Sequence, residues 1–169
     1  MIHPIVKFGD PVLEKPAAPI TVFDDELRKL VEDMFESMYA AHGVGLAAPQ
    51  IGISKRIAVI DVTFKEDPNA KIVLVNPEII HTEGRLTSNE GCLSLPEFRE
   101  KVARPQKATA RAQNVEGETI EVTGEDLLAR ALVHETDHLN GKLYINHISA
   151  LKRDMMKRKI RKLMKQGEW

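Results

Sequence analysis

The apolar positions of residues 24–42 recur at intervals of three and four, at Leu27, Leu30, Val31, Met34, Phe35 and Met38. This spacing puts them on one face of an α-helix, so a helix is predicted there. Asp24 can cap its N-terminus, and Gly43 is expected to end it. The first twenty residues are rich in proline and lack such a period, so we expect loop with at most one helical turn.

Short apolar runs in the middle of the chain predict strands. Residues 57–62 and 72–75 are too short and too sharply bounded for helices. Residues 98–112 form a further extended stretch, with an interruption expected near Pro105. A glycine turn at 114–118, followed by alternation at 119–122, is typical of a hairpin.

Two more helices are predicted in the last third of the chain. Thr123 has an acid three residues later, at Asp126, which fits a helix-capping box, and the helix that follows should end at Gly141. A last helix should run from about Ser149 to before Gly167. Strands and helices do not alternate regularly, so this order favours an α+β fold with antiparallel sheets over a doubly wound fold.

Composition and charge narrow the class of protein. A chain of 169 residues suits one domain, and its formal net charge of -1 gives no whole-chain field for nucleic acid or membrane. The charge is uneven, because residues 151–166 carry eight Lys or Arg and one acid. The single cysteine, Cys92, allows no intrachain disulfide, and we see no secretion signal and no apolar stretch of about 20 residues. We therefore expect a soluble protein of a reducing compartment.

The sharpest chemical feature is the string His-Glu-Thr-Asp-His at residues 134–138. Residues four apart share one helix face, so His134 and His138 can converge on a metal ion, with Glu135 beside them as general base or acid. The alternative is an amphipathic helix that carries two histidines by chance. A catalytic site also needs a third protein ligand and an open position for water. One class of zinc protease would place a histidine where this chain has Tyr144.

Cys92 is the better candidate for the third ligand. A thiolate with two imidazoles leaves one open position and suits Fe(II) or Zn(II). A lone cysteine is more often a small buried hydrophobic residue, but here it competes with a two-histidine helix that lacks a partner.

The segment Gly-Val-Gly-Leu-Ala-Ala-Pro-Gln at residues 43–50 is the second candidate for chemistry. It follows a helix and precedes a strand, which is the reverse of a phosphate-binding loop. Gly43 and Gly45 would allow an extended peptide to approach, and Gln50 could polarise a carbonyl group. A helix end followed by a tight loop explains the segment equally well.

Three segments together resemble the peptide deformylase family: Gly-x-Gly-x-Ala-Ala-x-Gln at 43–50, Glu-Gly-Cys-x-Ser at 90–94 and His-Glu-x-x-His at 134–138. Their order and separation also agree, and the resemblance covers nearly the whole chain. It implies metal-dependent hydrolysis of the N-formyl group from the N-terminal methionine of new polypeptides, with release of formate. The expected location is the bacterial cytoplasm, or an organelle if a transit peptide has been removed.

The resemblance also implies a role for each matching residue. Cys92, His134 and His138 would bind the metal, typically Fe(II), for which Zn(II), Ni(II) or Co(II) can substitute. Glu135 would move the protons, while Gln50 and the backbone N–H of Leu93 would hold the oxyanion. The remaining residues would bind the peptide backbone or its methionine side chain: Gly43, Val44, Gly45, Gly91, Leu127 and Ala131.

For the whole chain we expect antiparallel sheets packed around a central metal-binding helix. Residues 1–150 would form the catalytic domain, and residues 151–169 a basic C-terminal helix of the same domain. Val133 and Arg130 depart from the family pattern. We interpret Arg130 as a side chain that points to solvent, and neither residue as part of the metal chemistry. Glu90 and Asp137 could orient the histidines, although Asp137 fits a surface ion pair as well.

The basic segment carries an apolar stripe of Met156, Ile160, Leu163 and Met164. It is either a helix docked by that stripe or a patch for an anionic surface. Because deformylases act on chains that emerge from ribosomes, the resemblance suggests ribosome contact, with no membrane partner and no sequence-specific nucleic acid. The residues alone leave two other functions open: a zinc protease, and a non-catalytic module that binds metal or RNA.

Overall fold

The computed structural model describes all 169 residues. Three α-helices form, α1 (Asp25–Ala40), α2 (Leu127–Leu139) and α3 (Ala150–Lys165), with short 3-10 helices η1 (Pro11–Glu14), η2 (Ala48–Ile51) and η3 (Tyr144–His147). The strands are β1 (Gly45–Ala47), β2 (Ile57–Ile60), β3 (Ile72–Glu83), β4 (Leu86–Cys92), β5 (Leu95–Arg104), β6 (Lys107–Gln113) and β7 (Thr119–Glu125).

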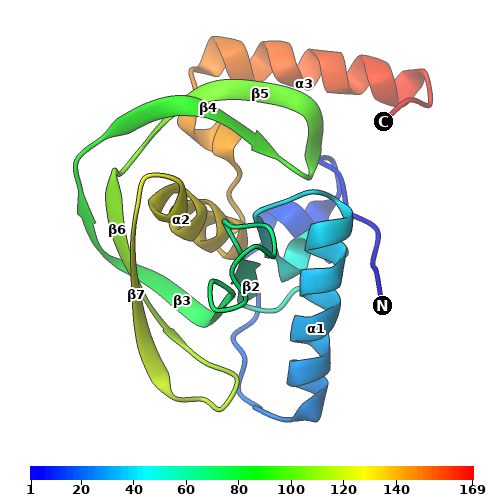
Figure 1. The fold of residues 1–169 in the computed structure, drawn as a ribbon. Helices are drawn as coiled ribbons and strands as arrows, with labels where there is room; N and C mark the ends of the chain where they lie inside the picture. The colour runs from blue at the N-terminus through cyan, green and yellow to red at the C-terminus, as the bar shows by residue number, and fades with distance from the viewer.

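Five strands form one antiparallel sheet in the order β1-β2-β3-β6-β7, which leaves β1 and β7 at its edges. The remaining strands, β4 and β5, pair only with each other in a separate antiparallel sheet. Helix α2 lies inside the curve of the strands and contacts β1, β2, β3, β5, β6 and β7 (Figure 1). The predicted α+β class, with antiparallel sheets around a central helix, is confirmed.

The predicted helices form, and the cap predicted at Asp24 is present. The Asp24 side chain accepts a hydrogen bond from the Leu27 N–H at 3.0 Å, and Ser149 caps α3 in the same way. Helix α1 ends at Ala40, before Gly43. The residue that takes the left-handed conformation there is His42, with φ of 58°, rather than a glycine.

The predicted capping box at the start of α2 is wrong. Thr123 lies within β7, and Asp126 precedes α2 with φ of 52° and no side-chain cap. The reason is that β7 pairs with β6 residue by residue as far as Glu125. A continuous strand ladder satisfies those backbone groups, so the local capping signal has no effect.

The sequence patterns did not predict two of the strands, and they predicted a third strand as too short. β4 consists mostly of polar residues and has no apolar alternation, yet it forms a ladder with β5. β1 has three residues within the glycine-rich segment. β3 continues well beyond the predicted residues 72–75, because its polar second half pairs with β6.

The C-terminal helix packs on the outside, along the β4–β5 sheet (Figure 1). Met156 and Ile160 are buried in one apolar cluster with Leu95 and Val102. The indole N–H of Trp169 donates to the Phe8 carbonyl at 2.7 Å and ties the end of the chain to its beginning. No helix has the length and apolar character needed to cross a bilayer.

Candidate metal centre

Helix α2 brings the two histidines of the predicted metal site together. Their Nε2 atoms are 3.1 Å apart, and both side chains are buried. His134 Nδ1 lies 2.6 Å from Glu90 Oε2. Since a carboxylate can only accept, Nδ1 carries a proton, and Nε2 is the atom that faces His138.

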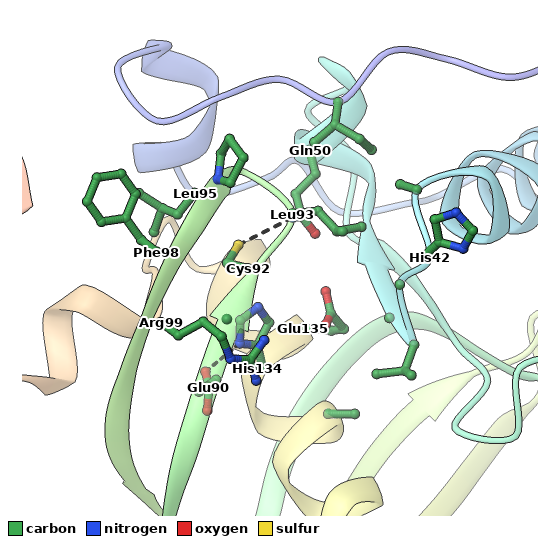
Figure 2. Close-up of a pocket in the computed structure, with 18 of the residues that line it drawn as sticks. His42, Gln50, Glu90, Cys92, Leu93, Leu95, Phe98, Arg99, His134 and Glu135 are labelled. Carbon is green, nitrogen blue, oxygen red and sulfur yellow. Dashed lines mark hydrogen bonds and ion pairs between the residues drawn. The ribbon is translucent and has the colours of Figure 1, made fainter. Parts of the chain in front are cut away.

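Cys92 completes the group from the end of β4. Its Sγ lies 3.4 Å from His138 Nε2, and the three possible ligand atoms lie within 4.8 Å of one another. Figure 2 shows Cys92 and His134 facing the same space, although they come from β4 and α2. Segments that are distant in the chain therefore meet as the sequence predicted, while the ligand roles themselves stay a prediction.

The electrostatics of this cluster favour a cation. Burial and the nearby charge of His134 hold the pKa of His138 well below its ordinary value, so that ring is neutral. Burial alone would also lower the pKa of His134, but Glu135, Cys92 and Glu90 raise it well above its ordinary value. This environment therefore favours positive charge at the point where two imidazoles and a sulfur converge. A divalent metal fits that environment, and the donor set suits Fe(II) or Zn(II).

Glu135 lies beside the cluster, and its carboxylate points toward the shared space (Figure 2). Burial raises its pKa to about 7, and its Oε1 is buried with no protein partner. Such a carboxyl can accept and release a proton near neutral pH, as a general base and acid must. A Cβ added at Gly45 would lie 2.5 Å from Glu135 Oε2, so the glycine makes room for this side chain.

Gln50 belongs to the buried helix η2, and its side chain approaches Cys92. Its Oε1 accepts the Ala47 N–H at 3.0 Å, and this bond fixes the amide orientation. The Nε2 group is thereby directed to Cys92 Sγ at 3.6 Å (Figure 2). It also lies 3.2 Å from Ser94 Oγ. A hydrogen-bond donor of Gln50 therefore faces Cys92, while its catalytic role stays a prediction.

A cavity of about 710 Å³ opens over these groups. The six residues predicted to bind substrate all line it: Gly43, Val44, Gly45, Gly91, Leu127 and Ala131. Leu93 also lines it, and a Cβ at Gly43 would lie 2.7 Å from the Leu93 side chain. The strand β1 forms one wall of the cavity. Because β1 is at the edge of the sheet, its outer side has no partner strand.

Sequence reasoning missed the arginines behind His134. Arg104 donates from Nε and Nη2 to the two Glu90 oxygens, at 3.0 and 2.7 Å, and from Nη1 to Asp137 at 2.8 Å. Burial alone would raise the pKa of Glu90, but its bonds with His134 and Arg104 hold the pKa well below the usual range. Asp137 also pairs at 2.8 Å with His147, a residue for which the sequence indicates no partner.

The expectation that Arg130 points to solvent is wrong. Its side chain is 9% exposed, and Nη1 lies 2.5 Å from Glu90 Oε1. It therefore touches the group that orients His134, contrary to the expectation that it stands apart from the metal chemistry. The sign of this burial in the sequence is that Arg130 is a single charged residue on an otherwise apolar turn of the helix. Val133, the other departure, lines a separate cavity with Arg56 and Asn140.

Comparisons with known proteins agree with this geometry. Residues 2–154 match the family described as polypeptide deformylase. The chain is 65% identical to a peptide deformylase of Acidobacterium capsulatum, over all of this chain and 99% of that protein. A peptide deformylase crystal structure from Legionella pneumophila is similar at 46% identity, with a TM-score of 0.90 over 99% of this chain and 98% of that one. A peptide deformylase structure from Thermus thermophilus gives 37% identity and a TM-score of 0.88, over 99% of this chain and 98% of that one.

Proposed function

The chain belongs to the peptide deformylase family, and we propose that it performs the family reaction at the cluster of Cys92, His134, His138 and Glu135. It is a metal-dependent hydrolase that removes the N-formyl group from newly synthesised polypeptides. Family membership decides against the zinc protease and the non-catalytic module. The observation that supports this site most strongly is the convergence of three ligand atoms within 4.8 Å beside a carboxyl of raised pKa.

Cys92, His134 and His138 are the proposed metal ligands. We propose Fe(II) as the native ion, with Zn(II), Ni(II) or Co(II) as substitutes, because one thiolate and two imidazoles suit ions of this softness. When bound, such an ion supplies a water molecule whose pKa is lowered to about 7.

Glu135 then handles the protons. It takes a proton from the attacking water and returns it to the amine that leaves as the formyl C–N bond breaks. Its pKa of about 7 supports both steps at neutral pH. The Gln50 amide and the backbone N–H of Leu93 donate to the oxygen that becomes negative. Each donor of this kind contributes roughly 3–4 kcal/mol to the transition state.

The peptide would lie as an extra strand along β1. This strand is an unpaired edge of the sheet, and Gly43 and Gly45 line the cavity beside it. Val44 and, across the cavity, Gly91 complete this backbone site. Leu127 and Ala131, on the α2 wall of the cavity, would receive the methionine side chain.

Helix α3 is the proposed ribosome contact. Its apolar residues Met156 and Ile160 are buried, while Arg158, Lys162 and Lys165 are exposed. The helix thus docks by Met156 and Ile160, while Met164 is exposed, and the cations that it presents support the proposed contact. We propose that residues 151–169 belong to one domain with the catalytic residues 1–150, and that the enzyme acts in the cytoplasm, where nascent chains emerge.

The test of this function is formate release from formyl-Met peptides by protein prepared without oxygen, with metal analysis of the same sample. Anaerobic work protects the thiolate of Cys92 from oxidation. We expect turnover that follows the content of bound metal and stops when a chelator removes it. Turnover that persists without metal would refute the proposed site.

A further inference from the structure

Glu90 is the buried group on which the orientation of His134 depends, and all of its acceptor capacity is used. Its Oε1 accepts from Arg104 and from Arg130, and its Oε2 accepts from Arg104 and from His134. A carboxylate offers about four lone-pair sites, so each position is taken. Glu90 is only 4% exposed. Loss of one of its hydrogen-bond donors would therefore cost free energy, because water does not reach the carboxylate to replace that donor.

Arg104 is shared between Glu90 and Asp137, so Arg130 supplies the second positive charge for these two carboxylates, but charge balance alone does not account for its other contacts. Arg130 differs in where it comes from and what else it holds. It lies on α2, one turn before His134. Its Nη2 donates to the backbone carbonyls of Leu86 at 3.2 Å and of Val102 at 3.1 Å, on β4 and β5 respectively.

These contacts matter because β4 and β5 share no strand ladder with the main sheet. β4 carries Cys92, whereas α2 carries both histidines. The distance between the sulfur and the imidazole pair is therefore set by how the β4–β5 sheet docks on α2. Arg130 is a side chain that bonds to both strands and to Glu90 at the same time.

We propose that Arg130 is a positioning residue of the metal centre, which holds Glu90 against His134 and locks the β4–β5 sheet to α2 at the spacing that the metal requires. This role rests on the ligand assignment proposed above. The guanidinium has the planar, multidentate geometry that three acceptors need, which a lysine cannot reproduce. Groups that orient metal ligands typically contribute about 10–100-fold to metal affinity.

The test uses the Co(II)-loaded protein. We expect R130M to release Co(II) to a chelator about 10–100-fold faster than the unmodified protein, and to show altered Co(II) d–d and thiolate-to-Co(II) absorption. R130K, which keeps the charge but replaces the planar guanidinium with a compact ammonium group, should lie between the two. It also keeps the test informative if R130M does not fold.

The matched control is R56M. Arg56 also ties the end of α2 to a neighbouring segment, through the Leu139 and Pro77 carbonyls and the Asn140 side chain, but it makes no hydrogen bond to Glu90. R56M should lower thermal stability while Co(II) release and absorption stay unchanged. The proposal is overturned if R130M and R130K match the unmodified protein within twofold, or if R56M changes the spectrum as much. A lack of thiolate-to-Co(II) absorption in the unmodified protein would instead refute the ligand assignment itself.

Discussion

Gly45 and Glu135 are in contact across the active cavity, and the contact leaves no room for a methyl group. A Cβ at Gly45 would lie 2.5 Å from Glu135 Oε2 and 2.9 Å from its Cδ. Gly45 is the first residue of β1, and Glu135 follows the first histidine on α2. The side chain of a central helix therefore rests against the edge strand along which we place the substrate.

Gly45→Ala should lower kcat/KM for formyl-Met peptides by about 10²-fold, because Glu135 must move by a fraction of an ångström or more from the attacking water. Metal content should be unchanged. Gly167→Ala is the control, since an added Cβ there meets nothing within 4 Å, and the backbone strain from its φ of 72° falls after α3 and outside the cavity. Steady-state kinetics with metal analysis decide the matter, and activity of Gly45→Ala within threefold of the unmodified protein would contradict this account.

Removal of the Glu135 charge should stabilise the metal-free protein at alkaline pH. The pKa of this carboxyl is raised from 4.5 to about 7 by burial. As the pH rises through this window, Glu135 loses its proton in the unfolded chain before it does so in the folded protein. The free energy of unfolding therefore falls, and the full decrease is reached above pH 7. The full cost is roughly 3 kcal/mol.

Urea unfolding of metal-free Glu135→Gln and of the unmodified protein measures this cost. Glu135→Gln should be more stable by roughly 3 kcal/mol at pH 8, with a difference below about 1 kcal/mol at pH 5. An advantage of equal size at both pH values would show that the substitution acts by packing. Turnover by Glu135→Gln should fall at least about 10²-fold, because the proton carrier is lost.

The patterns that predicted the fold correctly were the local ones. The helical period of α1, the strands β2 and β6, and the stop at Gly141 each follow from residues that are neighbours in sequence. β4 could not be predicted in this way, because its polar residues form a strand only through the ladder with β5. The false capping box at Thr123 has the same cause, since pairing with β6 decides its conformation.

The candidate site shows the same division. Spacing on a helix placed His134 and His138 on one face, and the absence of another thiol pointed to Cys92. The roles of Arg104 and Arg130 depend on contacts with Glu90 across the β4–β5 sheet. No periodicity in sequence encodes those contacts. The buried charge network behind the histidines therefore could not be predicted from the sequence.

The amide of Gln50 should contribute mainly to kcat. Gln50→Glu keeps the oxygen that accepts from the Ala47 N–H but replaces the donor that faces Cys92. We expect kcat to fall by about 10²–10³-fold with a smaller change in KM. Ser94→Ala removes a partner of the amide and keeps the donor, so its effect should stay below about tenfold. Retention of more than a tenth of the original kcat by Gln50→Glu would exclude the oxyanion role.

Charge reversal on α3 should separate ribosome binding from catalysis. The exposed cations Arg158, Lys162 and Lys165 lie on a helix that contributes no residue to the active cavity. Replacement of all three by Glu should weaken cosedimentation with ribosomes, and should reduce the dependence of log affinity on log salt by about three. Turnover of short formyl-Met peptides should stay unchanged.

The control for α3 is a triple variant with the same change in net charge on other surfaces. Lys55, Arg111 and Lys142 are exposed and lie outside α3. If their replacement by Glu weakens ribosome binding equally, overall charge rather than α3 is responsible. If neither triple variant loses affinity at low salt, α3 makes no electrostatic contact with the ribosome. Both variants keep Met156 and Ile160, the buried residues by which α3 docks, so neither substitution removes the docking contacts of the helix.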